Sequence, residues 1–229
     1  MRTRLLVAVA AVMLTLVGGP VKAGYEYSFD ASSYTVGVGQ TVNVNVYLTQ
    51  TGSTTGLSSV GLQSGGVQLN YNTTFVSNST SQITPNNTSF TGSTPTGFNP
   101  LFNYTLSGNG SNGLASGSSI LEVSQGSGSP VLAGSGSPNT SNSVLLGTFQ
   151  FTGVSVGQSL VVSTNSFSGL DVNVLGDGTV IDSMIQNSSA FINVVAVPEP
   201  GTLVLTGLLA MGGLVGGCAR RIRQKPAIA

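Results

Sequence analysis

The sequence lacks most of the side chains on which enzyme chemistry relies. Among its 229 residues there is no histidine, no tryptophan and a single cysteine. Charged residues make up 6% of the chain, against about 25% in an average globular protein. Without histidine, Ser-His-Asp and Cys-His catalytic sites are excluded, and so are the usual imidazole and thiolate zinc sites. Carboxylates, hydroxyls and amides are the reactive groups that remain.

Basic residues are absent from the long central part of the chain. All seven lie near the two ends: Arg2, Arg4, Lys22, Arg220, Arg221, Arg223 and Lys225. Between Gly24 and Ala219 there is no lysine or arginine, whereas all seven acidic residues lie there and give that stretch a net charge of −7. A region without cations cannot neutralise phosphates, so the central part is not expected to bind nucleic acid.

The N-terminus has the pattern of a secretory signal peptide. Arg2 and Arg4 precede an uncharged apolar run over residues 5–17. Small residues follow, and we predict cleavage after Ala23, which makes residues 1–23 the signal peptide. An uncleaved membrane anchor is the alternative, but the run is shorter than a typical membrane span.

The C-terminus has three parts in a fixed order. Pro198, Glu199 and Pro200 come first, an uncharged and mostly apolar run over 202–219 follows, and a cluster of basic residues closes the chain: Arg220, Arg221 and Arg223. As a helix, the run is nearly long enough to cross the hydrocarbon core of a membrane. By the positive-inside rule the basic cluster stays in the cytoplasm. This pattern predicts a precursor that spans the inner membrane once, with its body outside.

The three-part tail, residues 197–229, resembles the PEP-CTERM sorting signal of Gram-negative bacteria. The resemblance implies recognition by an exosortase, a membrane enzyme that would cleave near Pro198-Glu199-Pro200 and pass the protein to the cell surface or the extracellular matrix. It also implies an association with exopolysaccharide and biofilm. A plain single-pass anchor with a chance Pro-Glu-Pro is the alternative. Cys218 lies in the predicted span, so the mature region has no cysteine and no disulfide.

The central region, residues 24–196, is predicted to be one all-β domain. Apolar residues alternate with polar ones in 41–48, 66–71, 144–151, 159–162 and 191–195, which is the pattern of half-buried strands. Glycines are predicted to mark the turns between them: Gly37, Gly39, Gly52, Gly65, Gly153 and Gly157. Segments 77–97 and 107–143, rich in Gly, Ser and Asn, are predicted to be flexible loops, apart from a strand over 119–123. The expected fold is an antiparallel β-sandwich of the jelly-roll type.

Three of these strands resemble the strand motifs of cohesin domains. The opening motif is Tyr34-Thr35-Val36-Gly37-Val38-Gly39-Gln40-Thr41-Val42-Asn43-Val44, the next is Gly66-Val67-Gln68-Leu69-Asn70-Tyr71-Asn72, and the last is Leu146-Gly147-Thr148-Phe149-Gln150-Phe151. Asn72 stands where that family often has Asp. The resemblance implies a binding module with a cohesin-like fold, and we carry over neither its dockerin partner nor a contact residue.

The sequence has one patch rich in acidic residues, between Leu170 and Asp182. Asp171, Asp177 and Asp182 are candidate calcium ligands there, and Asp171, Asn173, Gly176 and Asp182 match positions of a calcium-loop template. Leu175 occupies a ligand position, however, and the closing Glu is missing. A β-hairpin with its turn at Gly176-Asp177-Gly178 is therefore favoured over a calcium site. No other cofactor is expected.

Two further patterns in the sequence are poor evidence for a function. Glu122 and Asp177 are available as a glycosidase pair, but nothing in the sequence brings them together. Asn-X-Ser/Thr triplets begin at Asn72, Asn78, Asn86, Asn87, Asn103, Asn109, Asn139 and Asn187, and we attribute them to composition. The leading interpretation is an exported, non-enzymatic surface or matrix protein that associates with polysaccharide. A carbohydrate- or protein-binding module is the second interpretation, and a secreted hydrolase is the third.

Overall fold

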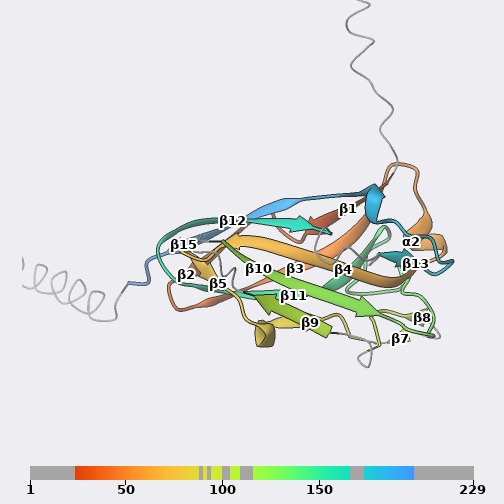
Figure 1. Cartoon of the computed structure of the whole chain (residues 1–229), viewed down its shortest axis with the longest axis horizontal. Coiled ribbons are helices and arrows are strands. Elements are labelled where there is room, and N and C mark those ends of the chain that lie inside the picture. Colours follow the sequence, from red (N-terminus) through yellow and green to blue (C-terminus); the bar gives the residue numbers. More distant parts are fainter. Residues whose placement is uncertain are drawn as a thin grey trace, which may run out of the picture.

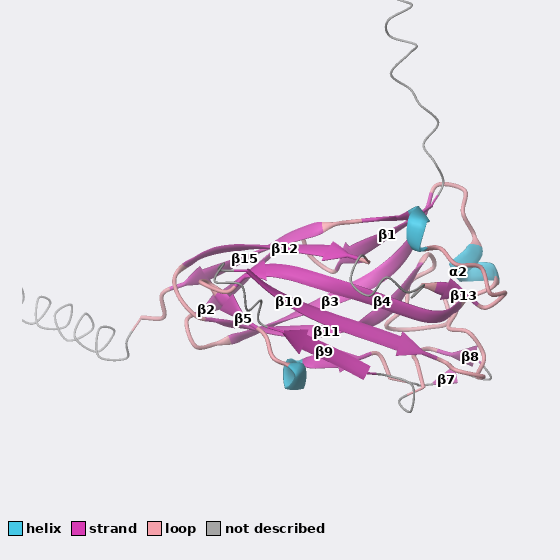
Figure 2. Ribbon diagram, viewed as in Figure 1, coloured by secondary structure: helices cyan, strands magenta, loops and turns pink. Residues whose placement is uncertain are grey.

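The structure is a computed structural model in which two β-sheets pack face to face (Figure 1). It describes residues 24–87, 90–91, 94–99, 104–108, 116–165 and 173–198. Figure 2 shows that strands dominate this part of the chain and that helices are short. The helical elements are α2 (Gly56–Ser59), η1 (Thr80–Gln82) and η3 (Asp182–Met184). The prediction of an all-β sandwich is therefore confirmed for the described residues.

The first sheet, here called sheet A, has the order β14-β1-β3-β11-β5, with β6 also paired to β11. Its strands are β1 (Gly24–Phe29), β3 (Thr41–Thr51), β5 (Val76–Ser77), β6 (Ile83–Pro85), β11 (Ser143–Gly153) and β14 (Ile185–Gln186). Sheet B has the order β2-β15-β12-β4-β10-β9, with β13 also paired to β4. Its strands are β2 (Ser33–Gly37), β4 (Leu62–Asn72), β9 (Tyr104–Gly108), β10 (Ser116–Ser124), β12 (Gly157–Thr164), β13 (Val174–Leu175) and β15 (Ser189–Val195). A separate small ribbon pairs β7 (Phe90–Thr91) with β8 (Thr94–Pro95).

The sheets are not purely antiparallel, which corrects the predicted topology. β1 pairs with β14 in parallel, and β15 pairs with β2 in parallel. Only residues 30–32 separate β1 in sheet A from β2 in sheet B. The chain therefore changes sheets between these two strands, and β2 lies parallel to β15 at the edge of sheet B. All other strand pairs named above are antiparallel.

Alternating apolar residues build the core between the sheets. In β3, Val44, Val46 and Leu48 are fully buried, whereas Asn43 and Asn45 point outward. The facing strands do the same, and the rings of Tyr71 and Phe151 meet edge to face with their centroids 5.0 Å apart. Burying each large apolar side chain contributes about 1.5–3 kcal/mol. The period-two pattern thus specifies which face of each long strand is buried.

The prediction of a turn at Gly65 is wrong. Gly65 lies inside β4, opposite Val123 of β10. A Cβ at Gly65 would sit 2.8 Å from Cδ2 of Leu146 in the other sheet. The missing side chain allows the two sheets to approach closely at this point. Its role is therefore packing. A turn was predicted because a turn glycine and a packing glycine look alike in the sequence.

The Gly- and Ser-rich segment over 125–142 is anchored to the body by backbone hydrogen bonds. Val131 exchanges two with Leu62, of 2.8 and 2.9 Å, and the amide of Ala133 donates to the carbonyl of Leu57. Val131 and Ala133 are buried. Two apolar residues within a polar segment are therefore sufficient to hold it against the core, although the composition predicts a flexible loop.

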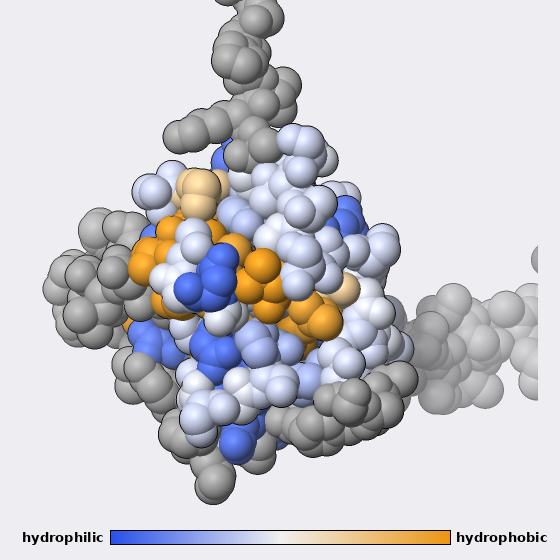
Figure 3. Space-filling model, turned by 90° about the vertical axis from the view of Figure 1, so that its right-hand side faces the viewer, coloured by the Kyte–Doolittle hydropathy of each residue, from blue (hydrophilic) through white to orange (hydrophobic). Residues whose placement is uncertain are grey.

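The two ends of the described chain lie at opposite ends of the sandwich (Figure 1). Figure 3 looks onto the end that carries α2 and β13, where a hydrophobic patch is visible on the surface. The other end, where the described chain finishes at Pro198, has a cluster of exposed valines: Val38, Val154, Val156, Val195 and Val197. Among the described residues, none of the helices has the length and apolarity needed to span a bilayer. The predicted signal peptide and membrane span lie outside those residues.

Candidate functional site

The outer surface of sheet A is largely polar, and we call it the polar face. Because side chains alternate along a strand, the residues between the buried ones all point to this side. They are Glu26, Ser28 and Asp30 on or next to β1, Asn43, Asn45, Tyr47 and Thr49 on β3, and Thr148 and Gln150 on β11. The polar face therefore offers amides, hydroxyls and carboxylates around one aromatic ring.

Cross-strand hydrogen bonds hold the side chains of the polar face in place. The Thr148 hydroxyl donates to Oδ1 of Asn45 at 2.6 Å, and the hydroxyls of Ser28 and Thr49 lie 2.7 Å apart. Nε2 of Gln150 reaches Oδ1 of Asn43 at 3.3 Å. Such pairs fix rotamers and leave further donors and acceptors on each amide directed to solvent. The face is thus organised before any ligand arrives.

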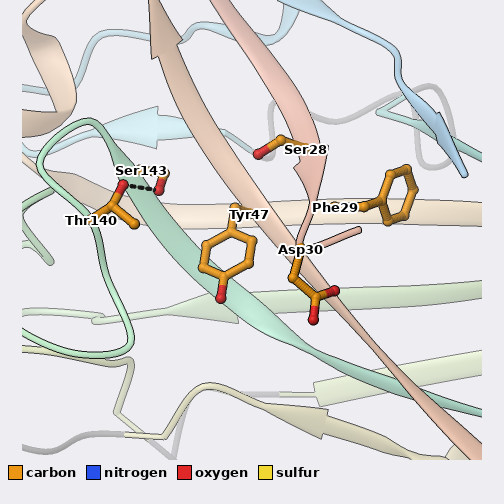
Figure 4. A pocket seen from close by; sticks show the side chains of 6 residues that line it. All are labelled: Ser28, Phe29, Asp30, Tyr47, Thr140 and Ser143. Atoms are coloured by element: carbon orange, nitrogen blue, oxygen red, sulfur yellow. Dashed lines mark hydrogen bonds between the residues drawn. The ribbon is translucent and has the colours of Figure 1, made fainter. Parts of the chain in front are cut away.

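A hollow of about 290 Å³ opens at one end of the polar face (Figure 4). Its lining comes from the end of β1, from β3 and from the turn that precedes β11: Ser28, Phe29, Asp30, Tyr47, Thr140 and Ser143. The Tyr47 ring stands in the middle of the view with the Asp30 carboxylate beside it, and Thr140 and Ser143 are hydrogen-bonded to each other on the far side. We call this the Asp30 hollow.

Three neutral donors fix the carboxylate of Asp30. Oδ1 accepts from the Tyr34 hydroxyl at 2.5 Å and from the backbone amide of Asn45 at 3.1 Å, and Oδ2 accepts from Nδ2 of Asn45 at 3.0 Å. Burial and the nearby carboxylate raise the pKa of Tyr34 above its ordinary value, so that its hydroxyl keeps its proton. The pKa of Tyr47 is raised by the same two causes. Asp30 is therefore oriented by its neighbours and remains without a cationic partner among them.

A second hollow of about 400 Å³ lies further along the polar face. It is lined only by polar side chains: Asn43, Ser81, Gln82, Thr84, Thr148 and Gln150. Gln82 is held by the capping box of η1 with Ser79, and its Nε2 donates to the Thr152 hydroxyl at 2.8 Å. We call this the Gln82 hollow. Together the two hollows make a lane of hydrogen-bonding groups along β3.

Residues 174–180 of the acidic patch form a hairpin, and its turn lies where the sequence predicted it. β13 turns back through Gly176 and Gly178, and the amide of Leu175 donates to the carbonyl of Thr179 at 2.9 Å. Asp177 lies on the fully exposed turn, where the Thr179 amide donates to its carboxylate and lowers its pKa. Within the described residues no three or more His, Cys, Asp or Glu side chains are grouped so as to hold a metal. Asp171, the third proposed calcium ligand, lies outside those residues, so the calcium hypothesis stays a prediction.

Asp182 and Asn173 belong to a buried structural network. Nδ2 of Asn173 donates to Oδ1 of Asp182 at 2.7 Å and to the Tyr27 hydroxyl at 3.1 Å. Oδ1 of Asn173 accepts from the amide of Gly66 at 3.1 Å. The pKa of Tyr27 is raised above its ordinary value, chiefly by burial. The calcium-loop match of Asn173 is therefore better explained by this network, which fastens the hairpin to both sheets.

Glu122 and Asp177 do not form a catalytic pair of carboxyl groups. Glu122 lies in the middle of β10, opposite Gly66 of β4, whereas Asp177 lies on the hairpin turn. Burial alone raises the pKa of Glu122, and no neighbouring charge contributes. A glycosidase needs two carboxyl groups that face each other across a sugar, and this arrangement does not supply them.

Several asparagines of the predicted triplets are structural. Asn78 is buried and its amide donates to the carbonyl of Gln150 at 2.7 Å, and Asn139 is buried and donates to the carbonyl of Thr96 at 2.9 Å. Nδ2 of Asn86 reaches the carbonyls of Thr96 and Leu145. These side chains are engaged inside the fold and are not available as sugar acceptors. Asn103 and Asn109 lie outside the described residues.

The residues of the two hollows were not predicted from the sequence, although the alternation of apolar and polar residues indicates some of them. The alternation in β3 places Asn43 and Asn45 on the outer face, and Tyr47 continues that series. The residues from Tyr25 to Asp30 alternate in the same way, but nothing in the sequence shows that they pair with β3 or that Gln82 comes to the same face. Of the predicted sorting residues, Pro198 is exposed at the end of the described chain, and Glu199, Pro200, Arg220, Arg221 and Arg223 lie outside it.

Comparison with known proteins identifies no family for this chain. No protein-family model and no curated protein matches the sequence. A chain of a type II cohesin–X-dockerin complex from Acetivibrio cellulolyticus aligns over 76% of this chain and 96% of its own length, with 14% identity and a TM-score of 0.37. AvmM, described as catalysing macrocyclization in alchivemycin A biosynthesis, aligns over 77% and 90%, with 9% identity and a TM-score of 0.35. At these TM-scores neither likeness carries an argument about fold or function, and the strand pairing alone establishes the two-sheet architecture.

Proposed function

We propose that this protein is an exported, non-enzymatic protein of the cell surface or extracellular matrix, and that it binds polysaccharide through the polar face. The observation that carries the proposal is the lane of hydroxyls, amides and carboxylates on sheet A, with one hollow beside Tyr47 and a second beside Gln82. Polyhydroxylated ligands need many donors and acceptors held at fixed positions, together with an aromatic surface for their apolar faces. A binding role also fits the composition of the body. Between Gly24 and Ala219 there is no histidine, lysine or arginine, and the one cysteine is Cys218 in the predicted membrane span.

Export rests on the two ends of the sequence. The positive start, the apolar run and the small residues before Ala23 support a signal peptide. Gly24, the first residue after the predicted cleavage site, belongs to β1 and pairs with Thr51. The Pro-Glu-Pro motif, the apolar run and the arginines support sorting by an exosortase and release near Pro198. Mass spectrometry of the protein from its native cell tests this part, because it reads both new termini. A protein that keeps residues 1–23 and 202–229 would contradict it.

Affinity electrophoresis of the full-length protein in gels containing different polysaccharides tests the binding proposal. We expect retardation by at least one neutral or amino polysaccharide. The double variant Asn43→Ala/Gln150→Ala removes one cross-strand amide pair from the polar face and should reduce the retardation at least about threefold.

The matched control is Gln158→Ala/Asn193→Ala, which removes a comparable amide pair from the outer surface of sheet B, where Nε2 of Gln158 donates to Oδ1 of Asn193 at 2.7 Å. This variant should bind as the wild type does. If both double variants bind equally well, the polar face is not the binding surface.

A further inference from the structure

The Asp30 hollow carries a negative charge that the body itself cannot neutralise. The three hydrogen-bond donors to the carboxylate are neutral, and they come from Tyr34 and Asn45. No lysine or arginine occurs anywhere between Gly24 and Ala219. Hydrogen bonds from neutral groups orient a carboxylate but leave its charge in place. A ligand that enters this hollow is therefore favoured if it brings a positive charge.

The remaining walls of the hollow suit a small amine attached to a sugar ring. Tyr47 lies beside the carboxylate and offers an aromatic ring, which attracts cations at its face. Ser28, Thr140 and Ser143 add hydroxyls around the ring. The volume of about 290 Å³ is at the small end of ligand sites. The space fits one substituted sugar unit and not a large aromatic ligand.

We propose that the Asp30 hollow selects sugar units that carry a protonated primary amine, within the polysaccharide that the polar face binds. The proposal rests on the proposed function and names the substrate class of that site. The ammonium group donates a charge-assisted hydrogen bond to Oδ2 of Asp30 and lies against Tyr47. N-acetylated units lack the charge, and acidic units are repelled. A sugar is favoured over a lysine side chain because the Gln82 hollow next to the site continues with hydroxyls and amides alone.

Calorimetry with matched oligosaccharides tests this selectivity on the full-length protein. The two probes are a glucosamine hexamer and an N-acetylglucosamine hexamer, at about pH 5.5, where the amines are protonated. We expect the wild type to bind the glucosamine hexamer at least about tenfold more tightly. Asp30→Asn should abolish this preference and leave binding of the N-acetylated hexamer within about twofold.

Glu26→Gln is the matched control, because it removes the same charge from the same face of β1 outside the hollow. The Glu26→Gln variant should keep the preference for the glucosamine hexamer. If the preference came only from the general attraction of a polycation to an acidic protein, Glu26→Gln and Asp30→Asn would weaken it equally. That result would overturn the proposal. In the wild type, the side-chain amide signals of Asn45 should shift in a nuclear magnetic resonance titration with glucosamine hexamer. Shifts confined to other residues would overturn the proposal even if Asp30→Asn fails to fold.

The remaining outcomes separate the two proposals. Equal binding of the two hexamers by the wild type overturns the amine selectivity and leaves polysaccharide binding intact. Failure of every polysaccharide and both hexamers to bind overturns both. A lysine-rich peptide that binds more tightly than the glucosamine hexamer, and loses this binding in Asp30→Asn, overturns the assignment to a sugar.

Discussion

Amide side chains take the structural place that charged residues have in most globular proteins. Asn78, Asn139 and Asn173 are buried and each bonds to groups distant in the sequence. An amide offers two donors and an acceptor without the cost of burying a charge. A chain with 6% charged residues can therefore fasten its loops with amides. The abundance of asparagine in the sequence follows from this use.

Asn173→Ala should destabilise the protein strongly. The substitution leaves the Tyr27 hydroxyl, the Gly66 amide and Asp182 without their shared partner in a buried network. We expect a loss of about 3 kcal/mol in the free energy of unfolding, measured by urea denaturation. Asn193→Ala, on the outer surface of sheet B, removes a hydrogen bond to Ser33 and should cost less than about 1 kcal/mol. Equal losses in the two variants would contradict a special role for the network.

Tyr27 should make the fold sensitive to alkaline pH. Burial raises the pKa of Tyr27 in the folded state above its ordinary value of 10.0. The folded state therefore holds this proton more tightly than the unfolded state does, and stability is full below about pH 10 and falls as the pH rises further. We expect the urea midpoint to drop as the pH rises from about 10 to about 12, and to drop less steeply in Tyr27→Phe. An equally steep fall in that variant would assign the effect to other groups.

At the scale of elements, the irregular point of β11 shows how the two sheets come together. The register of β11 against β3 shifts between Leu145 and Gly147, so that Leu146 turns into the core. Gly147 lies against β6, and a Cβ there would sit 2.5 Å from Cδ2 of Leu121 and 2.6 Å from the carbonyl oxygen of Thr84. A bulge of this kind redirects a strand and its side chains. Only glycine leaves room for β6 to pair on this edge.

Gly147→Ala should consequently destabilise the sandwich by about 2 kcal/mol or more, because the backbone of β6 cannot move aside as a flexible side chain could. Thermal denaturation followed by circular dichroism measures the change. Thr148→Ala is the neighbouring control, since its side chain lies on the outer face, and it should shift the midpoint little. A Gly147→Ala variant as stable as the control would show that β6 adjusts.

The alternation of apolar and polar residues predicted most of the long strands but not the strands of two residues. The five strands predicted from alternation correspond to β3, β4, β11, β12 and β15, and the strand predicted over 119–123 corresponds to β10, each somewhat longer than predicted. β5, β13 and β14 have two residues each, too few to show a period. The parallel pairing of β2 with β15 depends on a change of sheet between β1 and β2, which no local pattern encodes. Residue spacing reveals which face is buried, whereas tertiary pairing decides which strand lies next to which.

At the scale of the whole molecule, the same limit applies to the candidate site. The outward direction of Asn43 and Asn45 was readable from the alternation in β3. Asp30 reaches the polar face at the end of β1, where aromatic and polar residues do alternate, whereas Gln82 comes from η1, which belongs to a segment without alternation. A site assembled from strand ends and turns becomes visible only once the sheets are formed. The sequence could indicate a polar face, but it could not indicate the hollows.

The charge distribution predicts that anionic polymers do not bind the body. Because no cation lies between Gly24 and Ala219, the body cannot release counterions from phosphates or uronates. We expect no gel retardation by DNA or by alginate even at about 0.05 M salt, where electrostatic attraction is strong. The experiment uses full-length protein in which all seven basic residues at the two ends are replaced by Gln, which removes the cationic side chains of both ends: Arg2, Arg4, Lys22, Arg220, Arg221, Arg223 and Lys225. Retardation that salt abolishes would contradict this prediction.

The arrangement of the two hollows predicts that affinity depends on ligand length. The Asp30 hollow and the Gln82 hollow include Tyr47 and Asn43 of the same strand, four residues apart, which corresponds to about 14 Å along β3. A disaccharide is too short to occupy both hollows, whereas a hexasaccharide is long enough. Once one hollow holds part of a chain, the local concentration of its remaining units at the other hollow is high. Affinity should therefore rise at least about tenfold from disaccharide to hexasaccharide.

Calorimetry over a series of oligosaccharide lengths measures this rise, and variants of the second hollow assign it. Gln82→Ala/Thr84→Ala should flatten the series by removing two walls of the Gln82 hollow, while binding of the disaccharide at the Asp30 hollow stays unchanged. Both hollows include outward-facing residues of β3, so a polysaccharide chain that occupies both lies along this strand. If the affinity of the wild type is the same at every length, the two hollows do not act on one ligand, and the polar face binds through a single site.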